Sequence, residues 1–371
     1  MGLLLSAELA MGGQLAPGWL EIEDSRLIAA EHGPPPREPD ERADGILTAG
    51  LCDLQVNGAA GCEVSGGPSA LDAIDAAQLA SGVTSYLPAL VSPDSEIAAR
   101  VLPELARRAA DPLSPVAGVH LEGPFLSREH AGMHPRERLR SPAEGIPDWI
   151  EHPAVRLVTI APELPGALDL IARLSARGIA VALGHSGASS EVGRAAIDAG
   201  ARLVTHVFNA MAPFDHHSPG LVGLALVDER LHVSVIADGV HVHPVALELV
   251  RRTSGRRVLL ITDATPAAAT PPGRYVMGGM PIEASGGAAR TSDGVLAGSI
   301  MTLDQAVCNW AAMTRATLAE ALFAANEAAA VAAGLRDVAV VGAPADLVLL
   351  GPCGGVRRVM RAGRWLDQKS A

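Results

Sequence analysis

Lysine is almost absent from this sequence. Lys369 is its only lysine, so nearly all of the 29 Lys+Arg residues are arginines. Chemistry that needs a lysine ammonium or a carbamylated lysine inside the fold is therefore excluded, and this removes several types of metallohydrolase. Basic residues are also outnumbered, because 41 acidic residues give a formal net charge of -12. We see no basic stripe, so neither nucleic acid nor an anionic membrane surface is an expected partner.

Closely spaced cysteine pairs and long apolar runs are missing as well. The four cysteines, Cys52, Cys62, Cys308 and Cys353, are widely spread and form no Cys-x-x-Cys pair. Neither a zinc ribbon nor a disulfide scaffold is indicated, and we expect a reducing, cytoplasmic setting. No run approaches eighteen apolar residues, and no cationic segment precedes the apolar residues at the N-terminus. We therefore expect neither membrane spanning nor secretion.

The pattern of apolar segments predicts one large barrel with a smaller β-rich part. The chain has 371 residues, of which 49% are hydrophobic, enough for a sizeable core. Residues 1–50 alternate short apolar pieces with turns, and short strands return at 345–350 and 356–365. Between these two β-rich parts, predicted strands and helices alternate along the chain. We predict an α/β fold: a distorted (β/α)8 TIM barrel over residues 51–335, inserted into a small β-sandwich formed by residues 1–50 and 336–371.

Four apolar segments end in a side chain suited to metal or proton chemistry. These endings are Glu122, His185, His206 and Asp263. Parallel barrels build their sites at the C-terminal ends of strands, so four such endings in one chain indicate a shared site. For any single residue a structural role stays open: His185 as a cap of the turn that follows it, and Asp263 as the N-cap of a helix.

The types of these residues favour a hydrolytic metal site. Two imidazoles and a carboxylate form a common catalytic zinc set, because they leave a position open for water, whose pKa the ion lowers to about 7. Glu122, His185 and His206 supply that set. A carboxylate beside the metal can accept a proton from water and later release it to a leaving group, and Asp263 is the candidate.

Seven short segments carry a family resemblance whose order and spacing are highly specific. They are residues 53–58, 120–125, 184–186, 205–211, 237–241, 262–264 and 296–299. Over nearly its whole length the sequence resembles the N-acetylglucosamine-6-phosphate deacetylases of the amidohydrolase superfamily. This resemblance implies hydrolysis of the acetamide of an N-acetylated amino-sugar phosphate, giving acetate and the free amine. It also suggests a homodimer with loop exchange near the sugar site.

The same resemblance assigns roles to individual residues. Glu122, His185 and His206 would bind the metal, Asp263 would activate water and protonate the departing nitrogen, and His134 would help polarise the acetyl carbonyl. Charge develops on that carbonyl oxygen in the tetrahedral intermediate. The substrate would be contacted by Met133, Asn209, the backbone of Ala210, His241, Leu296, Ala297 and Gly298.

The number of metal ions follows from two residues on the first barrel strand. Many amidohydrolases carry a His-x-His pair there that helps to bind a second metal, whereas this chain has Gln55 and Asn57. Neutral amides are poor zinc ligands beside imidazole. We therefore predict one divalent metal per subunit, with zinc as the first choice and iron, cobalt or manganese also accepted by a Glu-His-His set. Two tightly bound zinc ions per subunit would contradict this.

Two departures from the family pattern concern the phosphate group. Where the family shows Arg-Glu-Pro-Gly, this chain has His217, Ser218, Pro219 and Gly220, and a family lysine is absent from residues 129–134. A permanently charged arginine fork is thereby lost. His217, with His130 and His216, supplies a replacement cation only when protonated, since an unperturbed imidazole has a pKa near 6.5. Histidines on a polar loop without a role are an equally good interpretation.

Three functions consequently stay open. The first is deacetylation of N-acetylglucosamine-6-phosphate, which the resemblance favours. The second is the same chemistry on an unphosphorylated or differently substituted N-acetyl amino sugar, which the missing cations motivate. The third is a sugar-binding protein without catalysis, and the intact metal set together with Asp263 argues against it.

Overall fold

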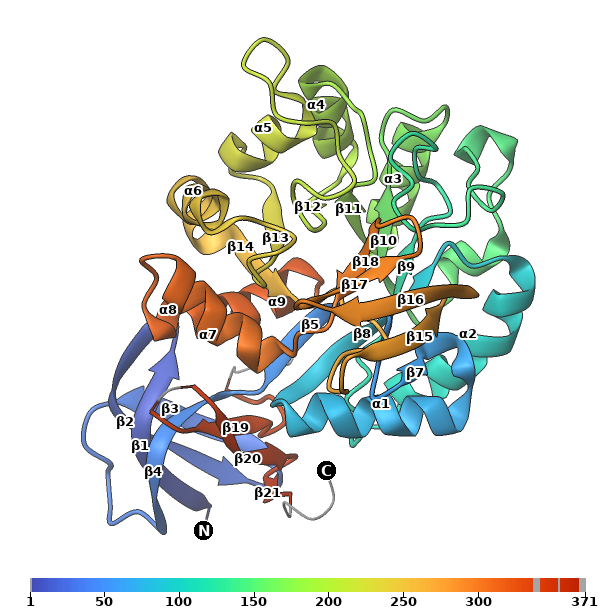
Figure 1. Ribbon diagram of the computed structural model, residues 1–371. Coiled ribbons are helices and arrows are strands. Elements are labelled where there is room, and N and C mark those ends of the chain that lie inside the picture. Colours follow the sequence, from blue (N-terminus) through green and yellow to red (C-terminus); the bar gives the residue numbers. More distant parts are fainter. Residues whose placement is uncertain (1, 336–340, 353, 367–371) are drawn as a thin grey trace.

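Eight parallel strands form the central sheet of the computed structural model, which describes residues 2–335, 341–352 and 354–366 (Figure 1). The first and last of these strands meet, because Val56 forms a parallel bridge with Ala264 and the Asn57 amide donates to the Ala264 carbonyl at 2.8 Å. The sheet is thus closed, and the predicted (β/α)8 barrel is confirmed. In spatial order its strands are β14 (Val258–Ile261), β13 (His232–Ile236), β12 (Leu203–Val204), β11 (Ala180–Leu183), β10 (Val155–Ile160), β9 (Val119–Glu122), β8 (Val83–Val91) and β5 (Leu51–Val56).

Helices cover the outside of the barrel, and several of them begin at side chains that cap their free amides. Asp94 accepts a hydrogen bond from the Ile97 amide at the start of α2, and Thr317 and Glu320 form a capping box at α8. The helices are α1 (Pro68–Ala80), α2 (Ser95–Ala109), α3 (Ala167–Ala176), α4 (Ser190–Ala199), α5 (Gly220–Val227), α6 (Pro244–Ser254), α7 (Leu303–Met313), α8 (Leu318–Ala325) and α9 (Glu327–Ala332), with 3-10 turns at Val64–Gly66, Pro142–Glu144, Asp148–Glu151 and Gly255–Arg257. No helix within the described ranges is long and apolar enough to cross a membrane.

Both ends of the chain build one seven-stranded sheet, the terminal sheet. In spatial order it contains β21 (Arg364–Trp365), β20 (Val356–Arg361), β19 (Leu347–Leu350), β4 (Glu41–Ala49), β1 (Leu3–Met11), β2 (Gln14–Glu23) and β3 (Arg26–His32). The free edge of β3 lies beside the segment that precedes β19. There the Leu27 amide donates a hydrogen bond to the carbonyl oxygen of Ala343 at 2.9 Å. The sheet thereby encloses its own apolar core, which includes Leu5, Leu20 and Met360. The predicted second, sheet-rich domain made from both termini is confirmed.

The domain limits set at residues 1–50, 51–335 and 336–371 stay predictions. The boundary between residues 335 and 336 adjoins 336–340, and these lie outside the described residues, as do Cys353 and Lys369.

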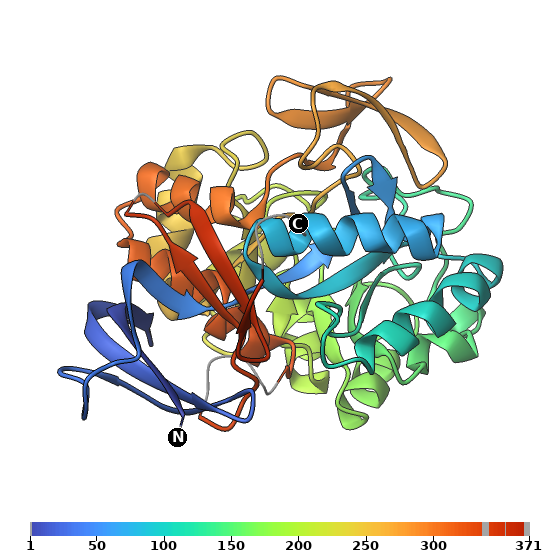
Figure 2. The ribbon, with the colours of Figure 1, turned by 90° about the horizontal axis from the view of Figure 1, so that it is seen from below.

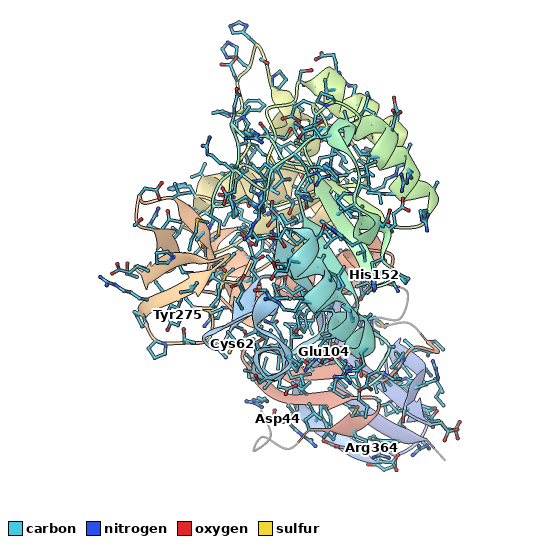
Figure 3. All side chains as sticks on the ribbon, turned by 90° about the vertical axis from the view of Figure 1, so that its right-hand side faces the viewer. Asp44, Cys62, Glu104, His152, Tyr275 and Arg364 are labelled. Carbon is cyan, nitrogen blue, oxygen red and sulfur yellow. The ribbon has the colours of Figure 1, made fainter. Side chains whose placement is uncertain are left out.

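A separate four-stranded antiparallel sheet interrupts the barrel, and the sequence pattern did not distinguish it. We call this sheet, residues 273–299, the hood; it contains β15 (Gly273–Met277), β16 (Met280–Ser285), β17 (Ala288–Thr291) and β18 (Leu296–Ser299). Figure 2 shows the hood projecting from the barrel, and Figure 3 shows Tyr275 on it, well away from Asp44 and Arg364 on the terminal sheet. Its core residues Met277, Ile282 and Ala297 pack around Met133. A short hairpin, β6 (Gly58–Ala59) and β7 (Cys62–Glu63), follows β5.

A buried arginine joins the terminal sheet to the barrel. Arg361 on β20 has a side chain only 6% exposed, and it forms an ion pair with Asp346 at 2.6 Å. The same guanidinium donates to the carbonyl oxygens of Thr84 and Ser114, which belong to the barrel side of the contact. An unpaired buried charge is costly, so this group fixes how the two parts meet.

We predict that Arg361→Ala lowers the free energy of unfolding by about 3 kcal/mol, because Asp346 is left without its charge partner. Urea denaturation monitored by circular dichroism measures the change. Arg364→Ala is the matched control, since Arg364 is exposed on β21, and its effect should stay within about 0.5 kcal/mol. Equal stability of the two variants would show that Arg361 does not support this contact.

Candidate metal centre and active-site cavity

The four side chains predicted from strand ends meet at one end of the barrel. Glu122 is the last residue of β9, while His185, His206 and Asp263 each stand two residues beyond β11, β12 and β14. The last three have φ values of 48°, 24° and 48°. Left-handed backbone is uncommon for residues other than glycine and costs free energy, and such strain clusters at functional sites.

Glu122, His185 and His206 form a buried group that can hold a metal ion. One ligand atom from each lies within 4.8 Å of the others. Glu122 Oε1 is 3.2 Å from His185 Nε2 and 2.9 Å from His206 Nε2. Ligands about 2.1 Å from a tetrahedral zinc ion stand about 3.4 Å from one another. The donor types and their spacing therefore fit one divalent ion.

His134 joins this group from the segment that follows β9. Its Nε2 is 3.3 Å from the second oxygen of Glu122, and its Nδ1 is 2.7 Å from the hydroxyl of Ser92. Ser92 directly follows β8 and has a φ of 38°, so a further strand end contributes to the site. The sequence pattern did not single out Ser92, since a serine after a strand is common in any loop.

Electrostatics keep Glu122 ionised and His134 neutral. Burial alone would raise the pKa of Glu122, but hydrogen bonds from His134, His185 and His206 outweigh it and hold that pKa well below its usual value. Burial is also the main influence on His134, and it lowers the pKa of this imidazole. Burial acts in the same direction on His206, but the hydrogen bond and the charge of Glu122 outweigh it and raise the pKa of this imidazole. A metal ion would have to displace that proton, since it binds the neutral ring together with the charged carboxylate.

Asp263 is held by two amides rather than by a helix. Its Oδ1 accepts hydrogen bonds from Gln55 Nε2 at 3.0 Å and from Asn57 Nδ2 at 2.8 Å. Gln55 Nε2 also donates to Glu122 Oε1 at 2.8 Å. Burial, and then the charge of Glu122, raise the pKa of Asp263. No helix begins at Asp263, so the N-cap alternative for this residue is wrong.

Residues behind Asp263 fix its backbone. Asp53 accepts hydrogen bonds from the Thr262 amide at 3.2 Å and from the Thr262 hydroxyl at 2.5 Å, and burial raises the pKa of Asp53 to about 7. On the other side the Ser299 amide donates to the Asp263 carbonyl at 2.9 Å. Gly298 has a φ of 123°, and a Cβ there would stand 2.5 Å from the same carbonyl. A glycine is therefore required where β18 passes Asp263.

A cavity of about 390 Å³ opens on this group. Three of the predicted substrate residues are hood residues at β18, and the others stand on loops of the barrel. The lining consists of Val91, Glu122, Gly132, Met133, His134, His185, His206, Asn209, Ala210, His241, Asp263, Met277, Arg290, Val295, Leu296, Ala297 and Gly298. The structure thus brings together every predicted site residue except His217, and it adds Arg290, Met277 and Val295 from the hood.

His241 and His217 differ sharply in their surroundings. His241 Nδ1 is 2.6 Å from the carboxylate of Asp238, and its buried Nε2 has no hydrogen-bond partner among the described residues. His217 is exposed on the loop before α5, where its ring lies 3.9 Å from that of His216. Within one subunit His217 is outside the cavity lining, so its contact with substrate stays a prediction.

We predict that His206→Ala removes most of the bound divalent metal, because only one imidazole and one carboxylate remain. Zinc content measured by mass spectrometry after equilibrium dialysis tests this. His217→Ala serves as the control and should keep the ion, since His217 is exposed and lies outside the group. Full metal occupancy in His206→Ala would show that the ligand set is wrong.

Proteins of known activity match this chain over most of its length, although no family model matches it. An N-acetylglucosamine-6-phosphate deacetylase of Bos taurus is 37% identical over 99% of this chain and 93% of its own. An N-acetylgalactosamine-6-phosphate deacetylase of Escherichia coli O157:H7 is also 37% identical, over 83% of this chain and 84% of its own. A mutant N-acetyl-D-glucosamine-6-phosphate deacetylase from Mycobacterium smegmatis, solved in complex with N-acetyl-D-glucosamine-6-phosphate, superposes with a TM-score of 0.91 at 36% identity, covering 98% of this chain and 99% of that chain. With these relatives and this fold, the chain belongs to the N-acetylglucosamine-6-phosphate deacetylase family.

Proposed function

We propose that this protein is a metal-dependent deacetylase that hydrolyses the acetamide of N-acetylglucosamine-6-phosphate to glucosamine-6-phosphate and acetate. The observation that best supports this proposal is that one cavity is lined both by the buried group of Glu122, His185 and His206 and by the carboxylate of Asp263. The relatives named above, which act on amino-sugar 6-phosphates by their names, support the same reaction.

The proposed cofactor is one divalent ion per subunit, with zinc as the first choice and iron, cobalt or manganese as alternatives. Such an ion, held by Glu122, His185 and His206, acidifies water and polarises a carbonyl group. The side-chain oxygen of Gln55, its possible metal ligand, accepts a hydrogen bond from the Thr205 hydroxyl at 2.8 Å, which supports the expectation that Gln55 serves no second ion. For Asn57 the expectation rests on the weakness of a neutral amide as a zinc ligand.

Asp263 is the proposed general base and then the general acid. Gln55 and Asn57 hold Oδ1, and no hydrogen bond to Oδ2 is seen among the residues that the structure describes. Oδ2 can therefore take the proton of the attacking water and later deliver it to the departing nitrogen. The raised pKa of Asp263 favours this exchange, because a catalytic group works best when its pKa lies closer to the operating pH.

His134 is the proposed donor to the acetyl carbonyl oxygen. The Ser92 hydroxyl, 2.7 Å from Nδ1, can donate to that nitrogen, and this arrangement keeps the proton of the neutral ring on Nε2. An Nε2–H group beside the metal-binding carboxylate would stabilise the negative charge that develops on the oxygen.

The sugar would lie against the remaining residues of the cavity. We assign substrate binding to Met133, Asn209, Ala210, His241, Leu296, Ala297 and Gly298, all of which line it. His217 would reach a substrate only from another subunit, so its role depends on the proposed homodimer. Cys52 and Cys62 are free thiols, which supports the proposed cytoplasmic setting.

We predict that Asp263→Asn lowers kcat roughly a thousandfold, because general acid–base catalysis contributes about 10²–10⁴-fold. Metal content and substrate affinity should be retained, since the amide keeps the shape of the carboxylate. Steady-state kinetics, zinc analysis and calorimetric titration with N-acetylglucosamine-6-phosphate measure these quantities. Asp198→Asn, on the exposed end of α4, is the control. Turnover near the normal rate would exclude Asp263 as the base.

The reaction itself is tested by acetate release from N-acetylglucosamine-6-phosphate and from N-acetylglucosamine, measured side by side with metal-loaded protein near neutral pH. We expect strong preference for the phosphorylated sugar. Equal rates would indicate a different N-acetyl amino sugar as the substrate, and absence of acetate from both would contradict the proposed function.

A further inference from the structure

The charges that line the active-site cavity leave one cation for an anionic substrate group. Among the described lining residues Glu122 and Asp263 are acidic, and Arg290 is the single arginine; no lysine is among them. The four lining histidines are His134, His185, His206 and His241. Two of these are in the group that can hold a metal ion, the Nε2 of a third, His134, is 3.3 Å from Glu122, and no imidazole carries a permanent charge. A permanent positive charge in this cavity therefore comes from Arg290.

The charge of Arg290 is not neutralised by a neighbouring carboxylate. Its Nη1 donates to the carbonyl of Gly294 at 3.0 Å, and no carboxylate lies within 4.0 Å of it among the residues described. Arg107, Arg230 and Arg251 each form an ion pair with an acidic side chain, whereas Arg140, Arg202 and Arg257, like Arg290, donate to backbone carbonyls. Of these carbonyl-bound arginines only Arg290 lines the cavity. A neutral carbonyl partner orients the guanidinium but does not neutralise its charge. The group can therefore still bind an anion.

The hood sets the position of Arg290 relative to the rest of the cavity. Arg290 is on β17, where its neighbour Ala289 is fully buried in the core of the hood and Leu296 is its partner on β18. Leu296 lines the same cavity. The β16–β17 turn also reaches the barrel, since a Cβ at Gly287 would stand 3.8 Å from Val240, the residue before His241. Arg290 therefore stands on a supported strand, at a cavity wall shared with His241.

We propose that Arg290 binds the phosphate of the substrate from within the same subunit and so determines the preference for phosphorylated amino sugars. This inference rests on the proposed function. A guanidinium presents parallel N–H groups that match two oxygens of a phosphate, and it stays charged at every physiological pH. It supplies the permanent charge that His217 cannot supply, because His217 is outside the cavity lining of its own subunit.

The test compares Arg290→Gln, Arg290→Lys and the control Arg274→Gln. Arg274 is exposed on β15 of the same hood and does not line the cavity. For N-acetylglucosamine-6-phosphate we expect Arg290→Gln to raise KM about 10- to 100-fold, as expected for the loss of a charged hydrogen bond. The kcat value should change less than about threefold, since the reacting atoms are untouched. Arg290→Lys should fall between Arg290→Gln and the unmodified protein, and kcat/KM for N-acetylglucosamine should not change in any variant.

A binding measurement separates this inference from the proposed function. Metal-loaded Asp263→Asn and the double variant Asp263→Asn, Arg290→Gln are titrated calorimetrically with N-acetylglucosamine-6-phosphate, with no turnover required. A loss of affinity of about tenfold or more in the double variant supports the role of Arg290. Unchanged affinity, or an equal loss for N-acetylglucosamine, overturns it. If acetate is never released while the affinity still depends on Arg290, the deacetylase function fails and the phosphate contact stands.

Discussion

The carboxylate of Glu122 is the interaction on which the candidate site depends. It is 3% exposed, and a buried charge is tolerated only where other groups pair with it. Gln55, His134, His185 and His206 all direct a nitrogen to its two oxygens. These partners come from β5 and from the segments that follow β9, β11 and β12, so the barrel must close with the correct register for the charge to be paired.

The hydrogen bonds that close the barrel also position Asp263. The seam between β5 and β14 is joined by Asp53, which binds Thr262, and by Asn57, which binds Asp263 through its side chain and Ala264 through its backbone. Loosening this seam would therefore displace the proposed base before it affected the distant helices. The left-handed backbone at Asp263 is strained, and bonds on both sides of it keep that strain in place.

The sequence was sufficient for the barrel and for the residues at its strand ends, because the C-terminal ends of parallel strands must meet. Glu122, His185, His206 and Asp263 were predicted in this way, and the structure brings them together. The hood was not predicted, because the alternation of residues 273–299 is that of any antiparallel strand and carries no sign of where the sheet packs. Arg290 was missed for the same reason, since only the fold shows that an exposed arginine lines the cavity. The hydrogen bonds of Gln55 and Asn57 could not be predicted from the sequence either, because they depend on how the barrel strands lie in space.

The division between barrel and hood separates two physical tasks. The proposed metal binding and proton transfer require positions accurate to a fraction of an ångström, and the strand ends of the barrel, which share a closed hydrogen-bond network, meet that requirement. Recognition of a phosphate tolerates more variation, because the attraction between charges falls slowly with distance. A small sheet that packs on Met133 and carries Arg290 on its own strand is adequate for that task. Changes in the hood can therefore alter which amino sugar is bound while Glu122 and its partners stay fixed, whereas a change at the β5–β14 seam would affect every substrate alike.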